Sequence, residues 1–335
     1  PVNVSVPAFR SKFLELYYGR YLRPLKDPIV AAIETTLPLM ARFKPGYNML
    51  TGSAAGQAFM KLAGLTALPT MPAMSLEREA ARLGVQVATL QRLKKLSMEE
   101  KTQAVVILAD VFSTHFDPAV VIAALKLALK MGFKPWLAMS QNNGKALHVH
   151  GYLGRFERAA AKSRDYLDRI SQMGVPLVGI DPSMTLTYRS EYAALPSTRL
   201  GASVLLLQEW LAANLDRLPS PRALPQERFT LLAHCTEKTN APAALKQWSV
   251  LFGKLGIKLN MADVGCCGMA GTFGHEVRNR AISEKLYTMS WQDRGAEDGD
   301  QTGVMATGFY CRSQVAKIDR QTIQHPVEIL DRLIA

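Results

Sequence analysis

The spacing of apolar residues divides the chain into a helical first part and a longer part in which short apolar runs alternate with helices. Residues 9–21, 28–43 and 75–96 repeat apolar positions at helical intervals. The sequence Ser97-Met98-Glu99-Glu100 then has the spacing of a capping box, which starts a further helix. We therefore expect residues 1–104 to form a helical arm or linker.

From residue 105 the pattern changes to that of a layered α/β domain. Short apolar runs predict buried parallel strands, with helices between them. Asp117-Pro118 opens the first of these helices, with Asp as N-cap and Pro at the first helical position. The predicted strands are 105–109, 134–139 and 176–180, and the predicted helices are 119–131 and 156–173. This alternation indicates a first α/β unit over residues 105–194.

The same order of elements returns after residue 229. The predicted strands are 229–233, 257–262 and 303–307, and the predicted helices are 241–255 and 275–291. A displacement of 124 residues places Leu108, Pro118, Gly132 and Gly144 on Leu232, Pro242, Gly256 and Gly268. The fold we predict is therefore α/β, with two pseudo-repeated Rossmann-like halves that have parallel sheets. The second half covers 229–335, and a segment with one helix at 203–215 joins the halves across 195–228.

The chemistry-bearing residues lie in only one half. All four cysteines, Cys235, Cys266, Cys267 and Cys311, follow predicted strands of the second half. The corresponding places of the first half hold Val111, Asn142-Asn143 and a residue near Asp181. One half therefore keeps a set of thiols and the other has none.

Carboxyl ends of parallel strands converge at one edge of a sheet, so loops there can bring ligands together. Four thiolates from three loops suit an iron–sulfur cluster of the [4Fe-4S] type or a tetrahedral zinc. Two adjacent thiolates, Cys266 and Cys267, fit a cluster with several irons more easily than a single zinc. We predict a metal or cluster site at the four cysteines, with ordinary buried thiols as the alternative. Thiol–disulfide chemistry at Cys266-Cys267 is a further alternative, which requires an exposed thiol of low pKa.

Three other residues are candidates for catalytic roles beside this site. His234 precedes Cys235 and His275 follows the Cys266-Cys267 loop, and either is a candidate ligand or proton donor. Arg312 follows Cys311 and is placed to bind a carboxylate or to adjust the potential of a cluster through its charge. For each of the three, a purely structural role is the alternative.

Composition narrows the classes of partner. The net charge of +12 has no Lys/Arg cluster with interleaved aromatic residues, so we expect no nucleic-acid partner. No apolar run reaches the roughly twenty residues that span a membrane, and no signal peptide opens the chain. Its clustered cysteines are typical of a reducing compartment, so we expect a cytoplasmic location, free or peripheral at the inner face of the membrane. Neither glycine-rich stretch has the order that an NAD site needs.

The order Cys235…Cys266-Cys267-Gly268…Cys311 resembles the cysteine-rich CCG domain. That domain occurs in heterodisulfide reductase, in anaerobic glycerol-3-phosphate dehydrogenase, and in the iron–sulfur components of glycolate and lactate oxidases. Residues 264–276, 306–314 and 325–327 are similar to the C-terminal part of bacterial FAD-linked iron–sulfur D-2-hydroxyglutarate dehydrogenases, a D-lactate dehydrogenase type. The chain departs from the general family in having Gln314 where a Cys-x-x-Cys motif would place its second cysteine.

The resemblance implies that the chain is the electron-transfer and metal-binding module of an oxidoreductase that acts on D-2-hydroxyglutarate or D-lactate. Its partners would be an FAD domain and a ferredoxin-like domain upstream of Pro1 in the same polypeptide, followed by an electron acceptor that the sequence does not identify. FAD would then bind outside this chain, and we expect the chain alone to be inactive. The competing hypothesis is a structural or interaction domain whose thiols bind zinc or no metal.

Overall fold

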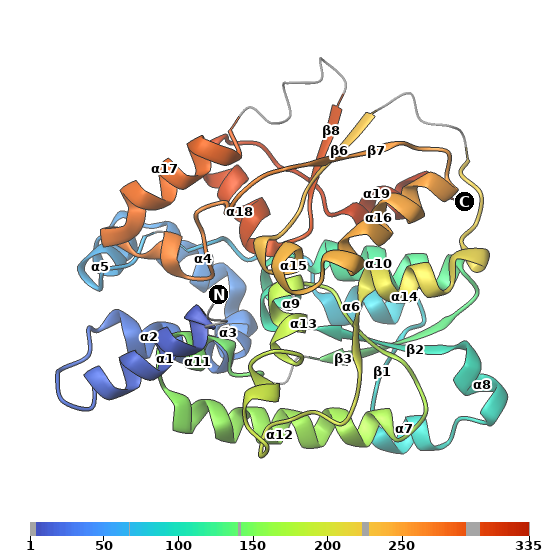
Figure 1. The fold of residues 1–335 in the computed structure, drawn as a ribbon, viewed down its shortest axis with the longest axis horizontal. Coiled ribbons are helices and arrows are strands. Elements are labelled where there is room, and N and C mark those ends of the chain that lie inside the picture. Colours follow the sequence, from blue (N-terminus) through green and yellow to red (C-terminus); the bar gives the residue numbers. More distant parts are fainter. Residues whose placement is uncertain (1–4, 67, 140–141, 223–227, 293–301, 335) are drawn as a thin grey trace.

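Two sheets of parallel strands, covered by helices, make up the body of the molecule (Figure 1). The structure is a computed structural model that describes residues 5–66, 68–139, 142–222, 228–292 and 302–334. Neighbouring strands of both sheets run parallel throughout. The predicted α/β class with parallel sheets is therefore confirmed.

The first sheet has five strands in the order β1-β3-β2-β4-β5. They are β1 (Gln86–Val87), β2 (Ala104–Ala109), β3 (Lys134–Met139), β4 (Leu177–Gly179) and β5 (Val204–Leu206). The second sheet has the order β7-β6-β8, with β6 (Arg228–Leu232), β7 (Leu259–Ala262) and β8 (Thr302–Ala306). In both sheets the strand that comes first in its repeat, β2 or β6, lies between the two that follow it, which is the arrangement expected of a duplicated unit.

Helices repeat with the strands. The first half contains α9 (Val111–Phe116), α10 (Pro118–Lys130), α11 (Lys145–Val149), α12 (Leu153–Ser171) and α13 (Pro182–Thr187). The second half contains α15 (Cys235–Asn240), α16 (Pro242–Lys254), α17 (Arg280–Ser290), α18 (Phe309–Ile318) and α19 (Pro326–Leu333). Both α15 and α16 begin and end 124 residues after α9 and α10, the displacement predicted from the sequence.

The N-terminal segment is mainly helical, as predicted. Its first helices lie on one side of the molecule, and its last three pack against the first half (Figure 1). Its helices are α1 (Val6–Tyr17), α2 (Lys26–Ala31), α3 (Ile33–Met40), α4 (Lys44–Gly52), α5 (Ala54–Leu62), α6 (Leu76–Arg82), α7 (Leu90–Lys94) and α8 (Met98–Gln103). The predicted capping box at Ser97 and Glu100 is present at the start of α8. We call residues 5–66 and 68–103 the arm.

Several elements differ from the prediction. Strand β1 lies inside a segment predicted to be helical, and β5 occupies the start of the helix predicted at 203–215. Only α14 (Leu207–Ala213) of that helix forms, because the Glu209 carboxylate accepts the Leu206 N–H and starts the helix there. The helix predicted from His275 begins at Arg280, after 3-10 turns η4 (Phe273–His275) and η5 (Val277–Asn279). Other 3-10 turns are η1 (Ala41–Phe43), η2 (Tyr192–Ala194) and η3 (Leu215–Arg217).

One hydrophobic core joins the halves. Helix α10 of the first half packs on α19, and α14 packs on α16. Leu125, Trp248 and Leu330 belong to the same cluster of buried side chains, and each is at most 1% exposed. The two halves are therefore expected to unfold together. Among the described residues, no helix is both long and apolar enough to cross a membrane.

Replacing Leu125 by Ala tests this shared core. We expect a loss of about 2–5 kcal/mol in the free energy of unfolding, because a fully buried Leu leaves a cavity. Leu129→Ala on the same helix is the control, since Leu129 is 37% exposed and its loss should cost less than about 1 kcal/mol. Urea unfolding followed by tryptophan fluorescence reports on both halves, through Trp136 of β3 and Trp248 of α16. Two separate transitions in the native chain would contradict a common core.

Candidate functional site

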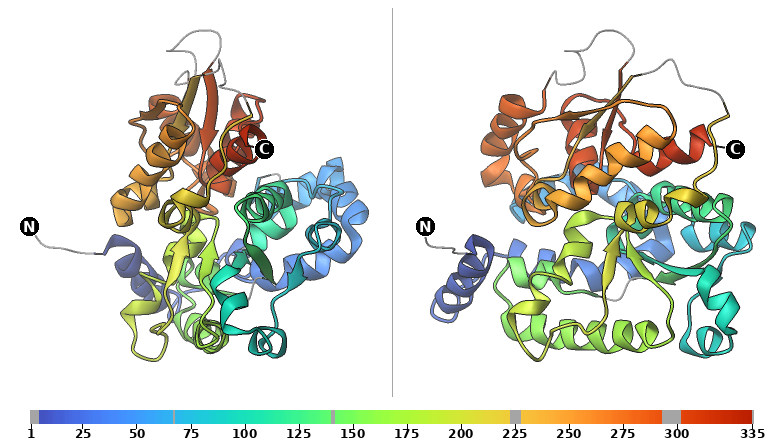
Figure 2. Two further views of the ribbon diagram at one scale, coloured as in Figure 1. Left: turned by 90° about the vertical axis from the view of Figure 1, so that its right-hand side faces the viewer. Right: turned by 45° about the vertical axis from the view of Figure 1, so that its right-hand side comes forward.

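The carboxyl ends of the two sheets face each other across the middle of the molecule (Figure 2). Asp181, which follows β4, crosses this junction. One of its carboxylate oxygens accepts N–H groups of Ser183 and Met184 and caps α13. The other accepts the N–H of Phe309, the first residue of α18, at 2.9 Å. A first-half carboxylate therefore binds the N-termini of two helices, one in each half.

The four cysteines come together at this junction. Cys235 begins α15 after β6, Cys266 and Cys267 follow β7, and Cys311 is the third residue of α18 after β8. Their side chains form a hydrogen-bonded row in which Cys235 contacts Cys266, Cys266 contacts Cys267, and Cys267 contacts Cys311. We call this set the thiol row. Cys267 and Cys311 are buried, and the other two are half-buried.

The hydrogen bonds within the row shift the pKa of its thiols in different directions. Cys266 accepts from Cys235 and Cys267, and also from the Gly268 N–H at 3.4 Å, and these bonds lower the pKa of its thiol. The same contacts and burial raise the pKa of the Cys235 and Cys267 thiols, which act as donors. The thiols of the row therefore influence one another's protonation.

The loop that carries Cys266 and Cys267 is held in a fixed conformation. Gly268 has a φ of 86°, and a Cβ there would lie 2.1 Å from the Ser283 carbonyl oxygen, so only glycine fits. The Gly265 N–H donates to the Ser290 hydroxyl, and the Trp291 indole donates to the Gly265 carbonyl at 3.1 Å. Helix α17 and the residue after it thus hold the two cysteines in place.

His234 lies directly beside the thiol row. Its Nδ1 accepts the Thr236 N–H at 3.1 Å and caps α15. Burial lowers the pKa of the imidazole, so the ring is neutral at pH 7. Gly308 packs on this ring, and a Cβ at Gly308 would lie 2.3 Å from His234 Cδ2. His234 is thus a fixed, neutral neighbour of the cysteines.

Arg312 is buried and makes contacts across the junction. Its guanidinium donates to the carbonyl oxygens of Ala306 and Thr307 at 2.8 and 3.0 Å, and to the Asp117 carboxylate of the first half at 2.7 Å. Asp117 was predicted to cap α10, but its side chain makes no cap hydrogen bond and instead binds Arg312. The Arg312 guanidinium is therefore engaged in hydrogen bonds with protein groups.

Three other polar residues of the second half make contacts of their own. His275, in η4, is buried, and its carbonyl accepts the Thr66 N–H of the arm. His325 caps α19 through Nδ1 and packs edge-on against Trp248. Gln314 donates to the Ser283 hydroxyl at 2.9 Å and is fully buried.

A polar network next to the thiol row was not predicted from the sequence. Glu237 of α15 accepts hydrogen bonds from the Thr307 hydroxyl, at 2.7 Å, and from the Gln208 amide, at 2.5 Å. Thr307 in turn accepts the His234 N–H. Burial raises the pKa of Glu237 to about 7. The sequence offered one sign of this network, since a charged residue, Glu237, stands two positions after Cys235.

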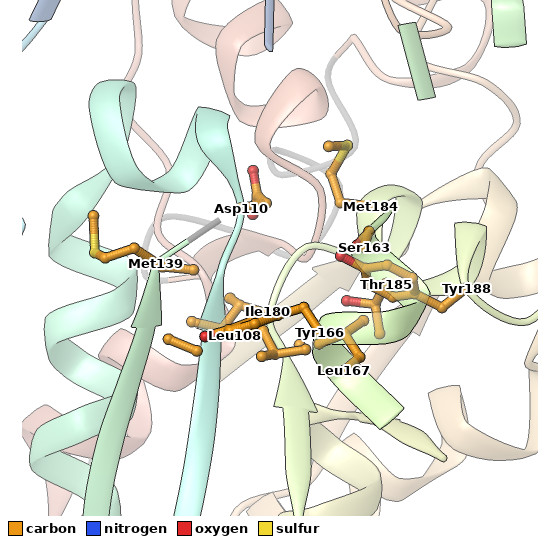
Figure 3. Close-up of a pocket in the computed structure, with 13 residues that line it drawn as sticks. Leu108, Asp110, Met139, Ser163, Tyr166, Leu167, Ile180, Met184, Thr185 and Tyr188 are labelled. Carbon is orange, nitrogen blue, oxygen red and sulfur yellow. The ribbon is translucent and has the colours of Figure 1, made fainter. Parts of the chain in front are cut away.

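The first half carries no thiols at the matching positions. Met184 is the third residue of α13, as Cys311 is of α18, so the counterpart of Cys311 is Met184, three residues after Asp181. Val111 and Asn143 correspond to Cys235 and Cys267. Figure 3 shows the residues that line a pocket at this edge, with Asp110 directly after β2 and Met184 beside it. Burial raises the pKa of Asp110 to about 6.

The four cysteine sulfur atoms are possible ligands for a metal ion or a cluster. Among the described residues, no three or more His, Cys, Asp or Glu side chains are arranged as a ready metal-binding group. The thiol row nevertheless brings together four soft sulfur donors, each next to one or two others, and thiolate sulfur is the ligand type of iron–sulfur clusters and structural zinc. The chemistry of the donor set therefore fits such a group, with Cys235, Cys266, Cys267 and Cys311 as the residues that would hold it.

Comparison with known proteins adds a relationship over nearly the whole chain. The chain is 40% identical over 331 residues to D-2-hydroxyglutarate dehydrogenase of Pseudomonas putida, and 39% identical over 336 residues to that of Escherichia coli K12. Its homologues are D-2-hydroxyglutarate dehydrogenases. The match covers 98–100% of this chain but only 32–33% of those relatives, so the chain spans about a third of their length.

A more distant similarity and one negative result complete the comparison. The chain is 21% identical over 203 residues to one component of the anaerobic glycerol-3-phosphate dehydrogenase of Escherichia coli K12, and the match covers 57% of the chain and 49% of that relative. No protein-family profile matches the chain.

Substituting Asp181 by Ala tests how the halves depend on each other. We expect the free energy of unfolding to fall by about 1–4 kcal/mol, because the N-caps of α13 and α18 are both lost. Asp181→Asn should recover much of this stability, since Asn is also a good N-cap. The control is Asp165→Ala, whose side chain is 64% exposed. Chemical unfolding curves measure all four chains, and equal losses in the Asp181→Ala variant and the control would contradict the bridging role.

Proposed function

We propose that this chain is the electron-transfer and metal-binding part of an FAD-linked iron–sulfur oxidoreductase that acts on a D-2-hydroxy acid, D-2-hydroxyglutarate or D-lactate. The observation that carries the proposal is the thiol row, at the junction of two related α/β halves, in a chain whose homologues are D-2-hydroxyglutarate dehydrogenases. The order of its cysteines supports its being a CCG domain of which one half keeps the thiols.

Each residue of the site has a definite part in this proposal. A cluster of the [4Fe-4S] type, when bound, supplies a one-electron carrier. Cys235, Cys266, Cys267 and Cys311 would bind it through their sulfur atoms. Gly268 holds the Cys266-Cys267 loop in its turn, and Asp181 and Arg312 hold α18.

His234 also has a part. Because its Nδ1 accepts the Thr236 N–H, the proton of the neutral ring is on Nε2, which leaves one donor N–H beside the row. His275 and Arg312 are engaged with protein groups and are proposed as positioning residues.

The partners are proposed to be an FAD domain and a ferredoxin-like domain of the same, longer polypeptide. The arm supports this part of the proposal, because it exposes large apolar side chains that a partner surface would cover. Phe9 is 67% exposed, Leu22 is 97% exposed and Leu25 is 73% exposed. A cytoplasmic, reducing location belongs to the same proposal, since the four cysteines are free thiols.

A second candidate is a structural or interaction domain whose thiols bind zinc or no metal. Two observations favour it. Gln314 stands where a further cysteine of the CCG motif would lie, and it is used in a hydrogen bond to Ser283. The first half has Met184 and Val111 in place of thiols.

Anaerobic purification followed by iron, sulfide and zinc analysis distinguishes the two candidates. We expect close to four irons and four sulfides per chain, with broad absorbance near 400 nm. The Cys266→Ser variant should lose most of this iron and absorbance, because a serine hydroxyl is a poor ligand for such a cluster.

All four cysteines belong to the row, so the control is a neighbouring residue outside it. Met289→Ser on α17 is suitable because Met289 is 69% exposed, and it should keep the iron and the spectrum. Zinc alone, or four free thiols without metal under strict anaerobiosis, would overturn the cluster and favour the structural candidate.

A further inference from the structure

A second, larger cavity lies between the arm and helix α18. Its volume is about 670 Å³ when the open space at its mouth is included. Ile33 and Leu37 of α3 form one side, and residues of α9 and α18 form the other. Almost all of its surface is apolar, so it suits a lipophilic ligand.

Three stacked phenyl rings line one wall of this cavity. The rings of Phe112 and Phe309 are inclined by 14° with centroids 6.0 Å apart, and those of Phe309 and Phe116 by 16° at 5.9 Å. All three residues line the cavity. Such a stacked group makes this wall aromatic, and a planar ring gains ring–ring contacts there that an aliphatic chain lacks.

The cavity also has polar side chains, among them Tyr310 and His275. Tyr310 lines it, and within the described residues its hydroxyl has no hydrogen-bond partner. The other hydroxyls are used, since Tyr47 donates to the Pro69 carbonyl at 3.1 Å and Thr272 bonds to His150 at 3.2 Å. The site is thus complementary to a flat, apolar ring that carries a carbonyl oxygen to accept the Tyr310 O–H.

The cavity and the thiol row share one turn of helix. Phe309 and Tyr310 are the first two residues of α18, and Cys311 is the third. A ring held against Phe309 would therefore lie within a few side chains of the row. From these features we propose that the cavity binds a lipophilic quinone, which is the electron acceptor of the enzyme.

The acceptor role rests on the function proposed above, whereas binding does not. Oxidation of the CH–OH group of a hydroxy acid to a carbonyl releases two electrons and two protons. Reduction of a quinone to its hydroquinone consumes two electrons and two protons, so the exchange balances without a further reactant. Tyr310 holds the ring by a hydrogen bond and has no other role in this step.

Binding of ubiquinone-1 to the chain, measured by isothermal titration calorimetry in the absence of substrate, tests the site. We expect one saturable site in the native chain. Ile33→Trp and Met40→Trp fill the cavity and its mouth, and each should weaken binding at least tenfold. The matched control is Ile282→Trp on α17, where Ile282 is 56% exposed and outside the cavity, and its binding should equal that of the native chain. Tyr310→Phe should weaken binding about fivefold through loss of the hydrogen bond.

The possible results test the quinone site and the proposed cluster independently. A chain that binds ubiquinone-1 but takes up no iron would contradict the cluster and keep the cavity assignment. A chain that contains the cluster but does not bind ubiquinone-1 would overturn the assignment, as would equal binding by Ile33→Trp. Decanol, which has no ring, should bind at least tenfold more weakly, and equal affinity for decanol would show that the cavity is not selective for quinones.

Discussion

Two carboxylates of the first half hold the helix that carries Cys311, and the arrangement of the site depends on them. Asp181 accepts the N–H of Phe309 at the start of α18, and Asp117 pairs with the buried Arg312 one turn later. Asp181 also accepts N–H groups on its own half, and Arg312 also donates to carbonyl oxygens on its own half. A partly buried ion pair with these additional hydrogen bonds is costly to break, because the remaining charge would be left desolvated. The first half has no thiols, yet it determines where the fourth thiol lies.

The arm closes the counterpart of the thiol site in the first half. Glu34 of α3 is buried, and its carboxylate accepts N–H groups of Asn143, Gly144 and Ala146 at 2.9–3.2 Å. Asn143 occupies the position that Cys267 occupies in the second half. Burial raises the pKa of Glu34 even though these N–H groups favour its ionised form. In the second half this loop carries two of the thiols, whereas in the first half its N–H groups bind a carboxylate of the arm.

A buried cluster of charges then ties the arm to both halves. Lys26 lies 2.9 Å from Glu276 of the second half and 3.0 Å from Asp27. Asp27 in turn lies 3.4 Å from His150 of the first half. Burial alone raises the pKa of Asp27, but the hydrogen bonds from His150 and Lys26 outweigh it and the pKa falls. These contacts join segments more than a hundred residues apart, and no periodicity in the sequence predicts them. The order of strands and helices and the meeting of the cysteines could be predicted, since strand ends converge by a general rule. The roles of Asp117, Glu34 and Glu237 could not, because each depends on a partner distant in the chain.

Helix α18 faces two environments, and this limits how its sequence can vary. Phe309 and Tyr310 line the apolar cavity, while Cys311 lies in the thiol row. Successive residues of an α-helix are rotated by about 100°, so moving the cysteine by one position would turn its side chain out of the row. Moving Phe309 would likewise remove one ring of the aromatic wall of the cavity. The two sites can therefore coexist only if the start of α18 is fixed along its axis and about it. Asp181 fixes the first residue and Asp117 fixes the fourth through Arg312, so a single turn of helix, held by the first half, sets the position of both sites.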